Sequence, residues 1–212
     1  RLSFPRFKMI HPAWCWLGYF LCTAGRPDEA REAIARALAL DPLSVAINWD
    51  AGFQYWQLRD RDRAIHQLRR VQQLDPDFFP AVGLLGAIRL FEGNVEAARR
   101  EFSRIKVLGP FWDEVVQAMG DRHRGIEALD RYVELAPGPV HWYLASTMYT
   151  LFGEPERALH WMEGHLHNVR GEEGRLETGG PGVTHLVRDP FFDGLRSHPR
   201  FVKILRRIGV DL

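Results

Sequence analysis

The sequence contains 212 residues, of which 46% are hydrophobic and 26% charged, so we expect a folded chain with a substantial apolar core. The 28 Lys and Arg residues nearly balance the 27 Asp and Glu residues, which gives a formal net charge of +1. This balance excludes the global charge excess that draws a domain to nucleic acid or to an anionic membrane. No apolar run reaches the roughly 18 to 20 residues that a membrane-spanning helix needs.

The first residues of the chain predict a short lead-in, residues 1–12, that packs over the exposed end of the helices that follow. The chain begins with Arg1 rather than Met, and we expect it to be a domain taken from a longer protein. The two cysteines, Cys15 and Cys22, lie on one predicted helix about 10 Å apart along its axis. A disulfide needs Cα atoms within about 7 Å, so we expect two reduced thiols and a cytoplasmic location.

From residue 13 onward, small residues and prolines recur at a fixed interval of 34. Two apolar stripes at helical spacing accompany each set, so each unit predicts two helices joined by a turn. We place the first three units at about 11–44, 45–78 and 79–112. Their structural residues are Trp14, Leu17, Gly18, Ala30 and Pro42, then Gly52, Tyr55, Ala64 and Pro76, then Gly86, Ala98 and Pro110.

After Pro110 the interval changes, because the next motif proline, Pro137, follows by only 27 residues. We interpret residues 113–138 as a shortened fourth unit and residues 139–167 as a fifth, so that helical pairs occupy residues 13–167. Residues 168–184 hold five glycines and predict a flexible loop. Residues 185–212 predict a capping segment, with a helical turn near Phe191 and a final helix from Pro199 to Ile208.

This 34-residue pattern resembles the tetratricopeptide repeat. The resemblance implies an all-α, right-handed superhelix of about five helix-turn-helix units with a C-terminal capping helix. A second resemblance lies in the tail, DPFFDGLRSHPRFVKILRRIG, from Asp189 to Gly209. It is similar to the closing segment of repeat domains at the C-terminus of bacterial signalling proteins. That similarity implies an upstream winged-helix DNA-binding domain, a Ser/Thr kinase or a nucleotide cyclase in the same chain.

In this repeat architecture the first helix of each unit lines a concave groove, and the resemblance therefore assigns a set of groove residues. Many are aromatic, and Trp and Tyr are frequent hot-spot residues at contact surfaces, so we expect the groove to bind a protein or peptide segment. The alternative is that the chain's own loop, its terminal helix or a second copy fills it. The predicted groove residues are Trp16, Tyr19, Trp49, Asp50, Phe53, Trp56, Leu84 and Phe91.

At the other candidate sites the residues favour a structural role over a functional one. His160, His165 and His167 stand near Glu163, but the sequence shows no fourth metal ligand nearby, so we predict no metal site. No nucleophile with its base, paired carboxylates or phosphate-binding loop is evident, and we predict no catalytic residue and no cofactor. The carboxylate clamp of chaperone-binding repeats would need Lys and Asn where Cys15 and Tyr19 stand.

The sequence thus predicts a non-catalytic interaction module. From its balanced charge and its short apolar runs, we expect neither direct binding to nucleic acid nor insertion into a membrane. Its partner would be a protein or peptide. The alternatives are a sensory domain for a small apolar ligand and a surface for homodimerisation.

Overall fold

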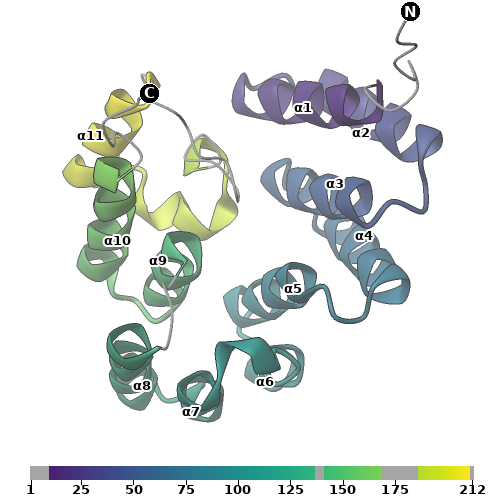
Figure 1. Cartoon of the computed structure of the whole chain (residues 1–212). Coiled ribbons are helices and arrows are strands. Elements are labelled where there is room, and N and C mark those ends of the chain that lie inside the picture. Colours follow the sequence, from purple (N-terminus) through teal and green to yellow (C-terminus); the bar gives the residue numbers. More distant parts are fainter. Residues whose placement is uncertain (1–9, 137–140, 169–185, 211–212) are drawn as a thin grey trace, which may run out of the picture. The chain divides into compact units, whose positions relative to one another are not determined.

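The computed structural model describes residues 10–136, 141–168 and 186–210, with side chains at 13–136, 141–166 and 186–210 (Figure 1). The lead-in up to residue 9, the stretch 137–140 with Pro137, and residues 169–184 of the predicted loop lie outside the described residues. Within the described ranges the regular secondary structure is entirely helical, and none of these helices is long and apolar enough to cross a membrane.

The chain divides into two compact units, Arg1–Leu84 and Leu85–Leu212. The division falls within α5, and each unit is described here by itself. The first unit holds α1 (Ile10–Thr23), α2 (Pro27–Leu40), α3 (Val45–Gln57), α4 (Arg61–Leu74) and the start of α5 (Phe79–Phe91). The second holds the rest of α5, α6 (Val95–Phe102), η1 (Lys106–Leu108), α7 (Pro110–Ala118), α8 (Arg122–Leu135), α9 (Trp142–Leu151), α10 (Pro155–Asn168), η3 (Pro190–Leu195) and α11 (Pro199–Arg207).

Consecutive helices pack as antiparallel pairs, and the recurring glycines lie where the two helices of a pair cross. Gly52 and Gly86 each face a large apolar side chain of the next helix, whereas the side chain nearest to Gly18 is Gln54 of α3. A Cβ atom added at Gly52 would lie 3.0 Å from Leu68, and one added at Gly86 would lie 2.9 Å from the Phe102 ring. Only a residue without a side chain allows so close an approach. The facing residues are themselves 34 apart, with Ile34 near Gly18, Leu68 against Gly52 and Phe102 against Gly86.

Local signals explain where the helices begin. Pro27 occupies the first turn of α2, where its missing N–H is not needed, and Asp28 and Glu29 place negative charge at that N-terminus. Ser44 caps α3 by accepting a hydrogen bond from the Ile47 N–H at 3.3 Å. The prolines Pro42, Pro76 and Pro110 are exposed in or beside the turns that separate the pairs.

The shortening after Pro110 has a structural counterpart. Helix α7, which begins at Pro110, has nine residues where α3 and α5 each have thirteen. Trp112 fills the resulting space: it is fully buried, its indole N–H donates to the Phe102 carbonyl at 3.4 Å, and its ring meets the Phe102 ring edge-on. A bulky aromatic side chain therefore replaces the missing helical turns in the core.

The C-terminal segment packs on α9 and α10. Phe191, Phe192 and Leu195 of η3 and Phe201, Ile204 and Leu205 of α11 are buried. The predicted final helix is found at Pro199–Arg207, and Ile208 is half-buried beyond its end. Polar contacts fix the segment, because the Tyr143 hydroxyl donates to Asp189 at 2.6 Å and the Arg200 guanidinium pairs with Glu163 at 2.8 Å.

The glycine contacts make a direct prediction. Gly86→Ala should lower the free energy of unfolding by about 1–3 kcal/mol, because its Cβ would press on the rigid Phe102 ring. Gly164→Ala in α10 is the matched control, since no atom lies within 4 Å of its added Cβ. It should raise stability by about 0.5–1 kcal/mol through helix propensity. Urea unfolding of both variants checks this, and equal effects would contradict it.

Candidate protein-binding site

The predicted groove residues of the first unit differ widely in exposure. Trp16 is 74% exposed, whereas Phe53 and Trp56 are buried, at 0% and 4% exposure. Tyr19, Trp49 and Asp50 are half-buried, and Leu84 is buried. Phe53 and Trp56 therefore belong to the packed interior of the unit, while Tyr19, Trp49 and Asp50 retain accessible surface.

The half-buried aromatic residues form a continuous row with the buried Phe53. Ring centroids lie 6.4 Å apart for Tyr19 and Phe53, and 5.8 Å apart for Trp49 and Phe53. Trp49 also meets Phe78 edge-on at 5.8 Å. The row runs from α1 across α3 to the turn before α5, and its mutual packing holds Trp49 in a fixed orientation.

Phe91, the predicted groove residue of the second unit, has a partner from the chain itself. It is 47% exposed, and its ring meets Phe191 of η3 edge-on at 5.7 Å. This contact agrees with the alternative in which the chain itself covers the groove residues of the second unit. We therefore look for a binding site in the first unit.

One face of α3 carries polar side chains where the repeat register favours apolar ones. Asp50, Gln54 and Gln57 are spaced as i, i+4 and i+7, which places them on the same face of the helix. This face packs on α1, because the Tyr19 hydroxyl donates to Asp50 at 3.0 Å and the Gln54 amide donates to the Cys15 carbonyl at 3.2 Å. We call Asp50, Gln54 and Gln57 the polar stripe of α3.

The 34-residue register shows how unusual the polar stripe is. The positions equivalent to Asp50 are Trp16 and Leu84, those equivalent to Gln54 are Phe20 and Ile88, and those equivalent to Gln57 are Thr23 and Phe91. Five of these six equivalents are large apolar residues. Sequence reasoning included Asp50 for its position but missed Gln54 and Gln57, although comparison across the register would have found them.

The polar stripe has hydrogen-bonding capacity that the described part of the chain does not use. Gln54 and Gln57 are 1% and 4% exposed, and neither Gln54 Oε1 nor Gln57 Nε2 has a hydrogen-bond partner there. No Lys, Arg or His among the described residues forms an ion pair with Asp50. Buried polar groups in folded proteins nearly always find partners, so these two atoms are exceptions within the described part of the chain.

Burial governs the electrostatics at Asp50. Burial raises the pKa of the Asp50 carboxyl to about 6, and hydrogen bonds from Tyr19 and Cys15 partly oppose that rise. Burial, followed by the negative charge of Asp50, raises the pKa of the Cys15 thiol to about 12. Burial and Asp50 likewise raise the pKa of the Tyr19 hydroxyl. Cys15 is therefore a protonated, poorly nucleophilic thiol.

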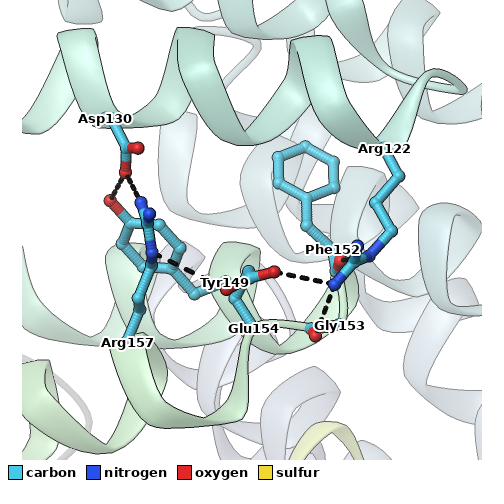
Figure 2. Close-up of polar contacts among 7 residues, drawn as sticks. All are labelled: Arg122, Asp130, Tyr149, Phe152, Gly153, Glu154 and Arg157. Carbon is cyan, nitrogen blue, oxygen red and sulfur yellow. Dashed lines mark hydrogen bonds and ion pairs between the residues drawn. The ribbon is translucent and has the colours of Figure 1, made fainter.

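A second tyrosine–aspartate pair, in the other unit, shows what a completed arrangement looks like. The Tyr149 hydroxyl donates to Asp130 at 2.8 Å, and the Arg157 guanidinium pairs with the same carboxylate oxygen (Figure 2). The carboxylate thus has both a hydroxyl and a cation. Asp50 has the hydroxyl of Tyr19 but no equivalent of Arg157 among the described residues.

The remainder of this cluster is also satisfied within the chain. Arg122 of α8 donates to the carbonyls of Phe152 and Gly153, at 2.8 and 3.0 Å, and pairs with Glu154 at 2.7 Å (Figure 2). These carbonyls lie at the end of α9, where backbone acceptors lack intrahelical partners. Arg122 therefore ties α8 to the turn between α9 and α10, and the cluster is structural.

The other sequence candidates are placed as follows. His160 is exposed and Glu163 is engaged by Arg200, while the side chain of His167 lies outside the described residues. Within the described ranges no group of three or more His, Cys, Asp or Glu side chains is arranged to hold a metal ion. Arg89, which stands where the first two units have Leu21 and Tyr55, pairs with Glu92 at 3.0 Å.

Stacked antiparallel helical pairs with small residues at each crossing define an all-α helix-turn-helix solenoid. Comparison with known proteins agrees: residues 11–44 match one family model described as tetratricopeptide repeat, and residues 54–111 match a second with the same description. The chain thus contains tetratricopeptide repeats over residues 11–44 and 54–111, and its fold is a helical solenoid of the same type. Such repeats typically mediate protein–protein interactions, and neither matching model describes a catalytic family.

Solved structures show the same fold. One is a tetratricopeptide repeat protein from Parabacteroides merdae, with 16% identity, a TM-score of 0.52, and alignment over 96% of this chain and 79% of that chain. Another is PilW, a widely conserved type IV pilus biogenesis factor, with 13% identity, a TM-score of 0.50, and alignment over 95% of this chain and 93% of that chain. At these identities the likeness concerns the fold alone. No curated protein matches the sequence.

The raised pKa of Asp50 predicts a pH-dependent stability. With a pKa of about 6 when folded and about 3.9 when unfolded, the carboxyl binds more protons in the folded state between these values. Its contribution to stability therefore falls as pH rises through this window. Asp50→Asn should be more stable than wild type, and the difference should widen by about 2 kcal/mol from about pH 4 to about pH 7.5.

Urea unfolding across this pH range measures the effect. Asp62→Asn, at an exposed aspartate of the same unit, controls for the loss of one negative charge. A difference between Asp50→Asn and wild type that stayed constant with pH would contradict the prediction.

Proposed function

We propose that this domain is a non-catalytic interaction module that binds a protein segment on its first unit, and that the segment carries a Lys or Arg side chain for Asp50. The observation that supports the proposal is the half-buried carboxylate of Asp50, which has a hydroxyl donor but no cation among the described residues. A strongly perturbed carboxyl in such a position is a candidate functional group.

The surroundings of Asp50 suit a cationic side chain. Tyr19 and Trp49 flank it on α1 and α3, and both retain accessible surface. Aromatic faces attract Lys and Arg side chains, and Arg more often. The rigid row of Tyr19, Phe53, Trp49 and Phe78 supplies apolar contact at little entropic cost on binding. Asp50 would provide charge specificity and Trp49 most of the contact area.

A wider setting comes from the tail. The resemblance of residues 189–209 to the closing segment of repeat domains in bacterial signalling proteins supports a role within a larger regulatory protein. In that setting the bound segment would belong to another domain of the same chain or to a partner of it.

Selection from a random peptide library against the 212-residue chain tests the proposal. Enriched peptides should carry Lys or Arg beside an apolar residue and bind with a Kd of about 1–100 µM. Asp50→Asn should weaken their binding by about tenfold or more, as expected for loss of a partly buried ion pair, and Trp49→Ala should do the same. Isothermal titration calorimetry measures both effects.

Matched controls keep this test specific. Asp77→Asn and Phe79→Ala change an exposed aspartate and a 49% exposed aromatic residue in the first unit and should bind like wild type. Far-ultraviolet circular dichroism verifies that each variant is folded. Enriched peptides without basic residues, or unchanged affinity in Asp50→Asn, would refute the proposal.

A further inference from the structure

An apolar face of α1 lies exposed on the first unit. Trp16, Leu17 and Phe20 are 74%, 40% and 64% exposed, and the exposed Ala13 lies on the same face of the helix. Leu17 was expected to be a structural residue of the repeat and Trp16 a groove residue. Clustered apolar side chains of this size on a folded domain mark a contact surface.

The repeat register shows what kind of object this face accepts. The positions equivalent to Leu17 and Phe20 in α3 are Ala51 and Gln54, which are 2% and 1% exposed because α3 packs on α1. The equivalent positions in α5, Leu85 and Ile88, are fully buried. The exposed face of α1 therefore has the position and the chemistry of a helix-packing surface.

Charge favours a second copy of the same face as its occupant. Helix α1, IHPAWCWLGYFLCT, contains no Asp, Glu, Lys or Arg, so two copies meet without repulsion between like charges. The solvent side of the terminal helix α11 instead presents Lys203 and Arg206, which are exposed. A basic surface is a poor match for Trp16 and Phe20, which disfavours head-to-tail stacking of one copy on the next.

We propose that α1 is the interface of an isologous homodimer, in which the exposed face of α1 packs antiparallel on the same face of a second copy. A two-fold axis near residue 18 brings Trp16 of each copy against Phe20 of the other. Such an interface closes on itself and stops at two copies. It uses a different face from the polar stripe, so the proposal does not rest on the proposed function.

The size of the face sets the expected affinity. Each aromatic side chain offers about 150–250 Å² of contact surface, whereas stable interfaces bury about 1,200–2,000 Å² in total. At exposures of 74% and 64%, Trp16 and Phe20 from two copies supply roughly 400–700 Å², which is below this range, so the rest of the α1 face must contribute as well. We therefore expect a reversible dimer with a Kd of about 1–50 µM rather than an obligate one.

Sedimentation velocity over about 1–300 µM tests the proposal on the 212-residue chain. Wild type should shift from monomer to dimer with no larger species. Phe20→Glu and Trp16→Gln should each raise the dissociation constant about 30-fold or more, because both side chains sit at the centre of the interface. Leu43→Glu, at a leucine that is also 64% exposed but outside α1, should leave it within about twofold.

Each outcome of these measurements either supports or overturns the proposed dimer. Because Trp16 and Phe20 are exposed, the variants should keep the melting temperature of the wild-type monomer, which separates loss of association from loss of folding. A wild-type chain that stays monomeric at the highest concentration would overturn the proposal. So would a dimer that Phe20→Glu and Trp16→Gln leave intact, or a series of species larger than a dimer.

Discussion

The close contact between a helical glycine and a large side chain of the next helix is the constraint on which the rest of the structure depends. Gly52 meets Leu68 and Gly86 meets Phe102 at distances that a Cβ atom would make too short. The two contacts stand 34 residues apart, so they give these two helical pairs the same crossing and the same register. Residues 34 apart therefore occupy comparable environments. A residue whose chemistry differs from that of its equivalents then points to a local requirement of its own.

The polar stripe of α3 is the clearest such departure. Leaving a buried donor or acceptor without a partner costs about 1–3 kcal/mol, and apolar residues at the equivalent positions show that folding does not require the polar groups. The chain nevertheless keeps a carboxylate and two amides against α1. The satisfied pair of Tyr149 and Asp130 with Arg157 shows that the fold readily supplies a cation to such a carboxylate. We propose that at Asp50 a partner supplies the cation.

Much of the fold follows from the sequence because its determinants are local and periodic. Glycine, alanine and proline markers predicted the helical pairs, and the all-α solenoid class is confirmed. The groove assignment depends on tertiary packing, which periodicity does not report. It identified the helix face that carries Phe53 and Trp56 but not that both are buried, and it overlooked the hydroxyl of Tyr19 as a link between α1 and α3.

Arg89 and Trp112 illustrate the same distinction. Arg89 stands at a position that is apolar in the first two units, and Glu92, one turn away, pairs with it. The use of Trp112 to fill the space left by a shortened repeat depends on side chains that meet only in the folded chain. The spacing of the prolines showed where the repeat is shortened, and the structure shows that Trp112 fills the space there.

The pKa of Asp50 measured by carbon-13 NMR, in the free domain and with a saturating basic peptide, tests the central claim most directly. The account predicts a value of about 6 in the free protein and a fall of more than about one unit in the complex, as a cation approaches the carboxylate. An ordinary value near 4 in the free protein, or a value that peptide binding leaves unchanged, would contradict it.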